Sequence, residues 1–318
     1  MAMPVILVAI MLIVHTLAPN SIPEPPPFFY EGYTFIELSN AWTVFLSIIL
    51  AGFLIWFIIA LFFEPPKLFL TKYAPLCTAV LALIFLYDVL SLHLAALNTM
   101  FFPWPERILN AMLADASILF YAWGNSIVLL MLGYIIGAAA GILSGVIAGY
   151  TAKARYWVRP LARFFSAVPV ITLVPIFIFI PFDFFLRAIL LISIAVWVPV
   201  TLIIMNGVMA IPKNTFEAAK TFGLKNHQIL IKVAIPAASP AIFNGLSQGM
   251  AIACVALIIA ETMGVAAGIG HYIGQQDGIA NYAGMYGAVI VLGTTFAIIN
   301  LALIIAKKIL LKHKGDNV

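Results

Sequence analysis

The chain has 318 residues, of which 64% are hydrophobic and only 9% are charged, and its formal net charge is +4. A mean hydropathy of +1.13 excludes an ordinary soluble domain, and many apolar stretches reach the roughly 20 residues that a membrane-spanning helix needs. These stretches are too long for the alternating strands of a membrane β-barrel, so we predict an all-α integral membrane protein.

Eight apolar stretches are predicted to cross the membrane. They cover residues 4–18, 42–63, 75–97, 120–149, 163–182, 186–208, 239–262 and 283–306. The first is short and resembles the apolar part of a signal peptide, but it lacks a positively charged leader and a clear cleavage site. We therefore expect it to be retained as a first span.

The basic residues predict the orientation of these spans. With both termini in the cytoplasm, fourteen of the sixteen Lys and Arg residues lie inside, which leaves Arg107 and Arg187 outside. The inner set is Lys67, Lys72, Lys153, Arg155, Arg159, Arg163, Lys213, Lys220, Lys225, Lys232, Lys307, Lys308, Lys312 and Lys314. The outer side carries Glu24, Glu31, Glu37, Glu106, Asp115, Asp183 and Asp277. This bias indicates a multi-pass protein of the plasma (inner) membrane, in contact with lipid, rather than a nucleic-acid-binding protein.

Ionisable side chains within spans are costly and often functional. Asp88 lies near the middle of the third span and should face protein or water, whereas His93 is close enough to the outer surface to be interfacial. Glu261, near the outer end of the seventh span, could line an outer vestibule or hold the following loop. Cys77 and Cys254 lie in apolar segments, which indicates buried thiols. We predict no metal site and no enzyme active site.

The fourth span carries a glycine at every fourth position. These residues are Gly133, Gly137, Gly141, Gly145 and Gly149. Residues four apart drift by only about 40° around a helix, so they form one shallow groove that permits close contact with another helix. We favour helix packing within one subunit over a contact that slides during a transport cycle.

Polar side chains in spans three, six and seven are candidates for a weakly polar passage. The candidate pathway residues are Asp88, Ser193, Thr201, Asn244, Ser247, Gln248 and Glu261. The same side chains could equally bond one another across helices, which is the commoner arrangement in membrane proteins.

A polar segment, residues 212–236, separates spans six and seven. Asn214 followed by Glu217 fits a capping box at the start of a short helix, and Gly223 stands where a glycine would end it. A second short helix is expected over 226–234, up to the next proline. Glu217 is expected either to cap the first helix or to pair with an arginine of a partner.

The order of residues in this loop resembles the EAA signature of ABC-type importer permeases, which is Glu-Ala-Ala, three residues, Gly, nine residues and Ile-x-Leu-Pro. The matching residues are Glu217, Ala218, Ala219, Gly223, Val233, Ile235 and Pro236, with conservative changes at the Ile and Leu positions. Residues 101–113, 159–178 and 260–273 resemble stretches of the permeases for nitrate, sulfonate, taurine and bicarbonate.

The resemblance implies a type I ABC importer-like transmembrane domain, with a six-span core at 71–318 and an N-terminal extension of about two spans at 1–70. It implies a permease subunit that passes a small anion. Its implied partners are two cytoplasmic ABC ATPase subunits coupled through the 212–236 loop, a second permease copy or paralogue, and an external solute-binding protein that docks near 101–118 and 264–282. The chain itself contains no Gly-x4-Gly-Lys-Ser/Thr phosphate loop, so ATP and Mg would be bound by the partner ATPases.

Two alternatives remain open. A secondary transporter driven by an ion gradient would need paired charges at mid-membrane or an inverted repeat, and the sequence shows only Asp88 and no clear repeat. A structural or assembly membrane protein without transport would leave the spacing of the EAA residues unexplained.

Overall fold

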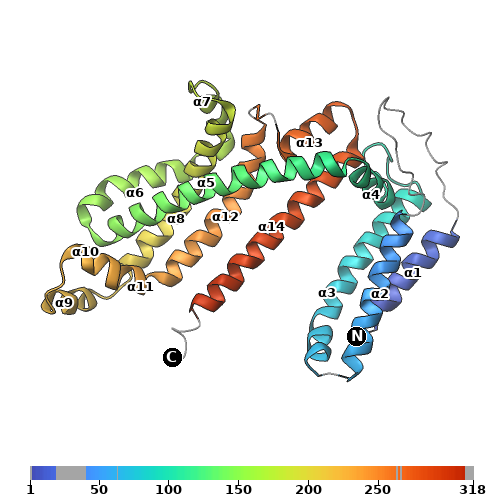
Figure 1. Ribbon diagram of the computed structural model, residues 1–318, viewed down its shortest axis with the longest axis horizontal. Helices are drawn as coiled ribbons and strands as arrows, with labels where there is room; N and C mark the ends of the chain where they lie inside the picture. The colour runs from blue at the N-terminus through green and yellow to red at the C-terminus, as the bar shows by residue number, and fades with distance from the viewer. Residues whose placement is uncertain (1, 19–40, 63, 263, 266, 312–318) are drawn as a thin grey trace. The chain divides into compact units, whose positions relative to one another are not determined.

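The computed structural model describes residues 2–18, 41–62, 64–262, 264–265 and 267–311, and every regular element among them is helical (Figure 1). The chain folds into two compact units. The first comprises Met1–Ala116 with Gln276–Gly287, and the second comprises Ser117–Gln275 with Ala288–Val318. The first unit therefore continues past the boundary expected at residue 70. Five of the charged residues used to predict the orientation of the spans lie outside the described residues: Glu24, Glu31, Glu37, Lys312 and Lys314.

Three helices that contact one another form most of the first unit: α1 (Met3–Leu17), α2 (Ala41–Phe62) and α3 (Glu64–Asp88). Met11, Trp42 and Leu46 are buried where they meet. A five-residue π-turn, η1 (Val89–His93), ends α3, and a short helix, α4 (Pro105–Ala114), packs against α2. The unit is thus a helical bundle with its own apolar core.

Six of the eight predicted crossings are confirmed as long apolar helices. They are Ala41–Ala60, Thr71–His93, Ala116–Tyr150, Phe184–Met209, Ser239–Glu261 and Tyr282–Ile309. The first predicted crossing is a helix of only 15 residues. At 1.5 Å per residue it is about 22 Å long, which is shorter than the roughly 30 Å of hydrocarbon.

The predicted fifth crossing, 163–182, is wrong as a single helix. The chain there forms α6 (Ala152–Ala167), the 3-10 turn η2 (Val170–Leu173) and α7 (Val174–Ile178), and the two helical parts are bent by 99°. Pro169 sits at the bend in an extended conformation that no helix interior accepts. A hydropathy average depends only on which residues lie in a segment. It therefore cannot distinguish a straight membrane-spanning helix from one that is broken in the middle.

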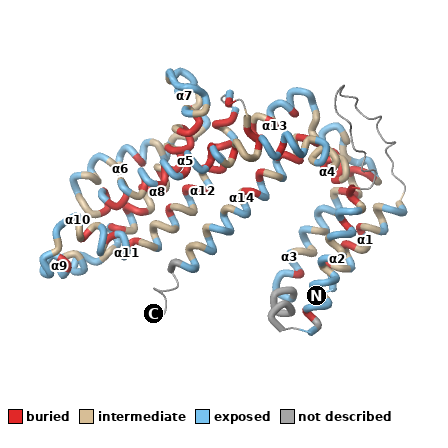
Figure 2. The backbone as a smooth tube through the Cα atoms, in the orientation of Figure 1, coloured by how far each residue is buried: buried red, intermediate tan, exposed pale blue. Residues whose placement is uncertain are grey.

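The second unit is centred on α5 (Ala116–Tyr150), α8 (Phe184–Met209) and α12 (Ser239–Glu261), whose buried residues lie where these helices meet (Figure 2). Gly133 faces Ile192 and Gly149 faces Val208, so α5 and α8 run parallel. Two parallel helices need a return crossing between them, and α6 with α7 is the segment that makes it. The fifth crossing is therefore a broken span. Gly245 faces Ile204 and Gly249 faces Val196, so α12 runs antiparallel to α8.

Candidate functional site

The first helix of the 212–236 loop, α9 (Lys213–Thr221), begins two residues earlier than predicted. Its N-cap is Pro212, with no capping side chain, and Asn214 accepts a bond from the neighbouring Thr215 N–H instead. The predicted Asn214–Glu217 capping box is therefore wrong. The fixed backbone of the proline sets the start of the helix. Glu217 is left on the exposed side of α9, while Ala219 is buried.

The predicted end of α9 is confirmed. Gly223 has a φ of +76°, its N–H donates to Lys220 O at 2.9 Å, and Leu224 N–H donates to Ala219 O at 3.2 Å. This pair of bonds is a Schellman turn, and its left-handed residue favours glycine because a Cβ would crowd the backbone. A rigid corner is thus built into the middle of the loop.

The second helix is shorter than predicted and does not stop at the proline. Regular helix covers only α10 (Asn226–Ile229), and a π-turn, η3 (Leu230–Ala234), follows it. Pro236 then lies in the first turn of α11 (Ile235–Ala237), where its missing N–H costs nothing. The widened turn lets the chain continue through the proline towards α12.

An exposed aromatic side chain stands at the corner of the loop. Phe222 is 87% exposed, next to Gly223, and Ile231 on the second arm is 62% exposed. Among the described residues, no atom lies within 4 Å of a Cβ added at Gly223. The corner therefore presents apolar surface together with the exposed carboxylate of Glu217.

Tyr150 links the loop to the end of α5. Its hydroxyl donates to Asn226 Oδ1 at 3.2 Å, and its ring lies edge-on to Phe216 of α9. The guanidinium of Arg155 bonds the carbonyl oxygens of Ala148 and Gly149, which closes the C-terminal end of α5. Both arms of the loop are thus held against the last turn of α5.

The glycine row of α5 packs against α8 within the same subunit, as favoured from the sequence. A Cβ on Gly141 would lie 2.7 Å from Val200 Cβ, and a Cβ on Gly137 would meet the backbone oxygen of Ser193. Gly145 and Gly149 face Ile204 and Val208 in the same way. The helix backbones are therefore closer than any residue larger than glycine allows.

The candidate pathway residues do not converge on one passage in this structure. Ser193 donates to Gly133 O at 3.1 Å, and the hydroxyl of the fully buried Thr201 lies 2.9 Å from that of Ser144, so both bond across to α5. Two others lie on α12: Asn244 is exposed and accepts from Lys307 of α14 (Tyr282–Leu311), and Gln248 is exposed. Ser247 donates to its own helix, at Phe243 O. Asp88 belongs to the first unit.

Glu261 is fully buried and holds the segment after α12. Its carboxylate accepts bonds from the Ser126 hydroxyl and from the Gly270 N–H, and Ser126 Oγ accepts from Ile269 N at 2.8 Å. A Cβ on Gly270 would lie 2.7 Å from Glu261 Oε2, so the backbone can approach only because this residue is glycine. Of the two roles considered for Glu261, this geometry supports the holding role.

Glu261→Ala should loosen that segment. A hydrogen bond to a charged group contributes about 1.5–3 kcal/mol, so amide exchange over residues 267–272 should accelerate about 10- to 100-fold. Hydrogen-exchange mass spectrometry of the intact chain measures this change. Gln248→Ala, an exposed change on the same helix, should leave those residues unaffected. Equal exchange in Glu261→Ala and the unmodified chain would refute the holding role.

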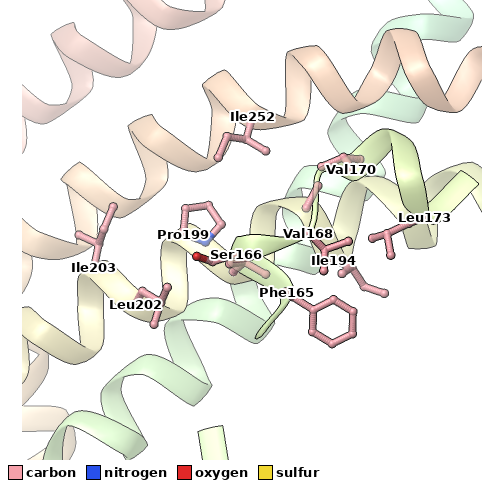
Figure 3. A pocket seen from close by; sticks show the side chains of 12 residues that line it. Phe165, Ser166, Val168, Val170, Leu173, Ile194, Pro199, Leu202, Ile203 and Ile252 are labelled. Atoms are coloured by element: carbon pink, nitrogen blue, oxygen red, sulfur yellow. The ribbon is translucent and has the colours of Figure 1, made fainter. Parts of the chain in front are cut away.

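An apolar hollow of about 300 Å³ opens beside the broken span (Figure 3). Its lining comes from Phe165 and Ser166 of α6, from η2, from Ile194 and Pro199 of α8, and from Ile252 of α12. Ser166 supplies the one polar side chain among the described residues that line it. Such a surface offers little to hold an anion tightly.

Comparison with known proteins gives a consistent set of similarities. Residues 137–314 match the family described as "Binding-protein-dependent transport system inner membrane component". SsuC of Bacillus subtilis, a permease protein assigned to aliphatic sulfonates transport, is 34% identical over 143 residues, which are 45% of this chain and 51% of that protein. The chain thus spans about half the length of that relative.

More distant similarities extend over more of the chain. The taurine transport system permease protein TauC of Escherichia coli is 25% identical over 57% of this chain and 68% of its own length. The nitrate import permease protein NrtB of Leptolyngbya laminosa is 27% identical over 57% of this chain and 65% of its own. Among solved structures, a chain of the MetNI methionine ABC transporter in an inward-facing conformation matches with a TM-score of 0.54 at 21% identity, over 61% of this chain and 96% of that one. That match shows a shared fold.

Proposed function

Because this chain belongs to the family of binding-protein-dependent transport system inner membrane components, we propose that it is the permease subunit of an ATP-driven importer and that its 212–236 loop is the contact with the ATPase. The observation that carries this proposal is the corner at Gly223, with Phe222 87% exposed beside it. A rigid, exposed corner between two spans suits insertion into a cleft of another subunit. The signature residues Glu217, Ala218, Ala219, Gly223, Val233, Ile235 and Pro236 all lie in this loop.

We expect Tyr150 to transmit a displacement of the 212–236 loop to the membrane-spanning helix α5. A partner that displaces α9 and α10 pulls on Asn226 and Phe216, and both contact Tyr150 at the end of α5. Behind Tyr150, the glycine row fixes α5 to α8 without space between them. We expect the two helices to move as one body, because tightly packed surfaces shift together rather than deform.

The proposed cargo is a small anion of the sulfonate, taurine, nitrate or bicarbonate type. The names of the related permeases for sulfonates, taurine and nitrate support this class. Ser193 and Thr201 of α8 bond to α5, and the hollow beside the broken span is apolar. A passage of this character favours release over tight binding, so an external binding protein would select the anion and dock near 101–118 and 264–282.

The full assembly is proposed to contain two copies of the permease or one copy with a paralogue, and two ATPase subunits that bind ATP and Mg. With both termini proposed to lie in the cytoplasm, the 212–236 loop would face the ATPase, and Lys213, Lys220, Lys225 and Lys232 would add positive charge there. A gradient-driven transporter would not need such a corner.

Co-purification from the native membrane tests this proposal. The tagged chain, extracted in mild detergent, should bring with it an ABC ATPase that mass spectrometry identifies. Phe222→Ser should reduce its recovery at least about tenfold, because an aromatic anchor in a buried pocket often contributes 2 kcal/mol or more. The matched control is Phe179→Ser, since Phe179 is 86% exposed but lies near the opposite end of α8. Recovery of no ATPase after cross-linking would favour the gradient-driven transporter.

A further inference from the structure

Three potential metal ligands converge in the first unit, at the end of the α1–α3 bundle. His15 comes from the last turn of α1, Asp88 from the end of α3 and His93 from η1. Their ligand atoms all lie within 4.8 Å of one another. Glu106, in the first turn of α4, adds a second carboxylate 3.6 Å from His15 Nε2. The spacing of these residues along the sequence gives no sign that they meet.

The π-turn brings two of the ligands together. In a regular α-helix, residues five apart lie about 140° from each other around the axis, so Asp88 and His93 would diverge. In η1 the Leu94 N–H bonds Val89 O at 2.9 Å, five residues back, and this wider turn places both side chains against His15. Such π-turns inside helices occur frequently at functional sites.

Two buried atoms, one on Asp88 and one on His15, lack a hydrogen-bond partner among the described residues. The Asp88 side chain is 2% exposed, yet its Oδ2 lies 3.7 Å from His15 Nδ1, which is too long for a hydrogen bond. Among the described residues, no hydrogen-bond partner is present for Asp88 Oδ1 or for His15 Nδ1. A buried carboxylate needs compensation from a charge or from donors. A cation between these side chains would supply it.

We propose that His15, Asp88 and His93 bind a divalent transition-metal ion, with Zn²⁺ as the preferred occupant and Glu106 as a fourth ligand or an outer partner. Two imidazoles with one or two carboxylates are typical Zn²⁺ ligands, whereas Mg²⁺ and Ca²⁺ prefer oxygen alone. Ligands about 2.0–2.2 Å from the ion lie a little over 3 Å apart, so the side chains must close by roughly 1 Å. The ion would tie α1 to α3 and α4 and balance the charges of Asp88 and Glu106.

Cobalt substitution in the full-length chain tests the site. The protein carries a tag without histidine, is purified in detergent and is freed of metal with a chelator. Titration with Co²⁺ should produce visible absorption that saturates at one equivalent and is displaced by Zn²⁺. Asp88→Asn and His15→Gln should each weaken Zn²⁺ binding at least about tenfold, since even outer-shell changes cost 10–100-fold. His227→Gln, which changes an exposed histidine of the second unit, should leave binding unchanged.

The alternative occupant is a proton. A charged His15 between Asp88 and Glu106 would satisfy part of the same geometry without metal. A chain that shows no Co²⁺ absorption, or that binds Zn²⁺ equally well as Asp88→Asn, would overturn the proposal. The Co²⁺ titration of the unmodified chain decides the matter even where a variant does not fold, and His93→Gln provides a further variant. The result is independent of whether an ATPase binds the 212–236 loop.

Discussion

Gly223→Val should leave the protein inserted in the membrane but should uncouple ATP hydrolysis from transport. The φ of +76° at this position is strained for any β-branched residue, at a cost of about 1–3 kcal/mol. The Schellman turn would open, and Phe222 would lose its fixed position relative to Asn226. In proteoliposomes with the co-purified ATPase and binding protein, uptake of a labelled sulfonate or nitrate should fall at least about tenfold while hydrolysis persists.

Gly223→Asn separates backbone conformation from contact surface. Asparagine visits the left-handed region more readily than other side chains, so transport should stay near normal. No atom of the described residues lies within 4 Å of the added Cβ, so a loss of transport in the asparagine variant would point to a contact with the partner. Normal transport by Gly223→Val would show that the corner does not couple, and equal loss in both variants would contradict the conformational argument.

The predictions from sequence succeed where one residue type sets a local geometry. Gly223 was predicted to end a helix, and the chain turns there with positive φ. The α5 glycines were predicted to form a groove for close packing, and α8 occupies it. The spacing of the glycines predicts which face of the helix is closely packed. It does not predict which helix packs against that face, or that the two helices run parallel.

The predictions fail where a proline or a π-turn changes the helical period. Pro212 starts α9 earlier than Asn214 would, and Pro169 breaks the fifth crossing. Hydropathy averages over about 19 residues and does not see either change. The grouping of His15 with Asp88 and His93 needs both a π-turn and a contact between helices distant in sequence. Neither the π-turn nor the contact between distant helices produces a repeating pattern in the sequence.

Gly137→Ala should destabilise the second unit strongly for so small a change. Its Cβ would meet the backbone oxygen of Ser193, which cannot rotate away, as well as Val196 Cβ at 2.8 Å. Overpacking of this kind costs about 1–3 kcal/mol. At roughly 2–4 °C for each kcal/mol in a protein of this size class, the apparent melting temperature should fall by about 2–12 °C. Size-exclusion chromatography after stepwise heating in detergent measures it.

Gly124→Ala is the matched control because Gly124 lies on the same helix and an added Cβ meets no atom within 4 Å in the part of the chain that the structure describes. Alanine is the better helix former by about 0.5–1 kcal/mol, so this variant should be neutral or slightly more stable. The expected changes in melting temperature have opposite signs for the two variants. Their comparison therefore separates the effect of helix propensity from the effect of packing. Equal melting temperatures for the two variants would mean that α5 and α8 are not in close contact along the glycine row. The proposed movement of both helices as one body would then lose its physical basis.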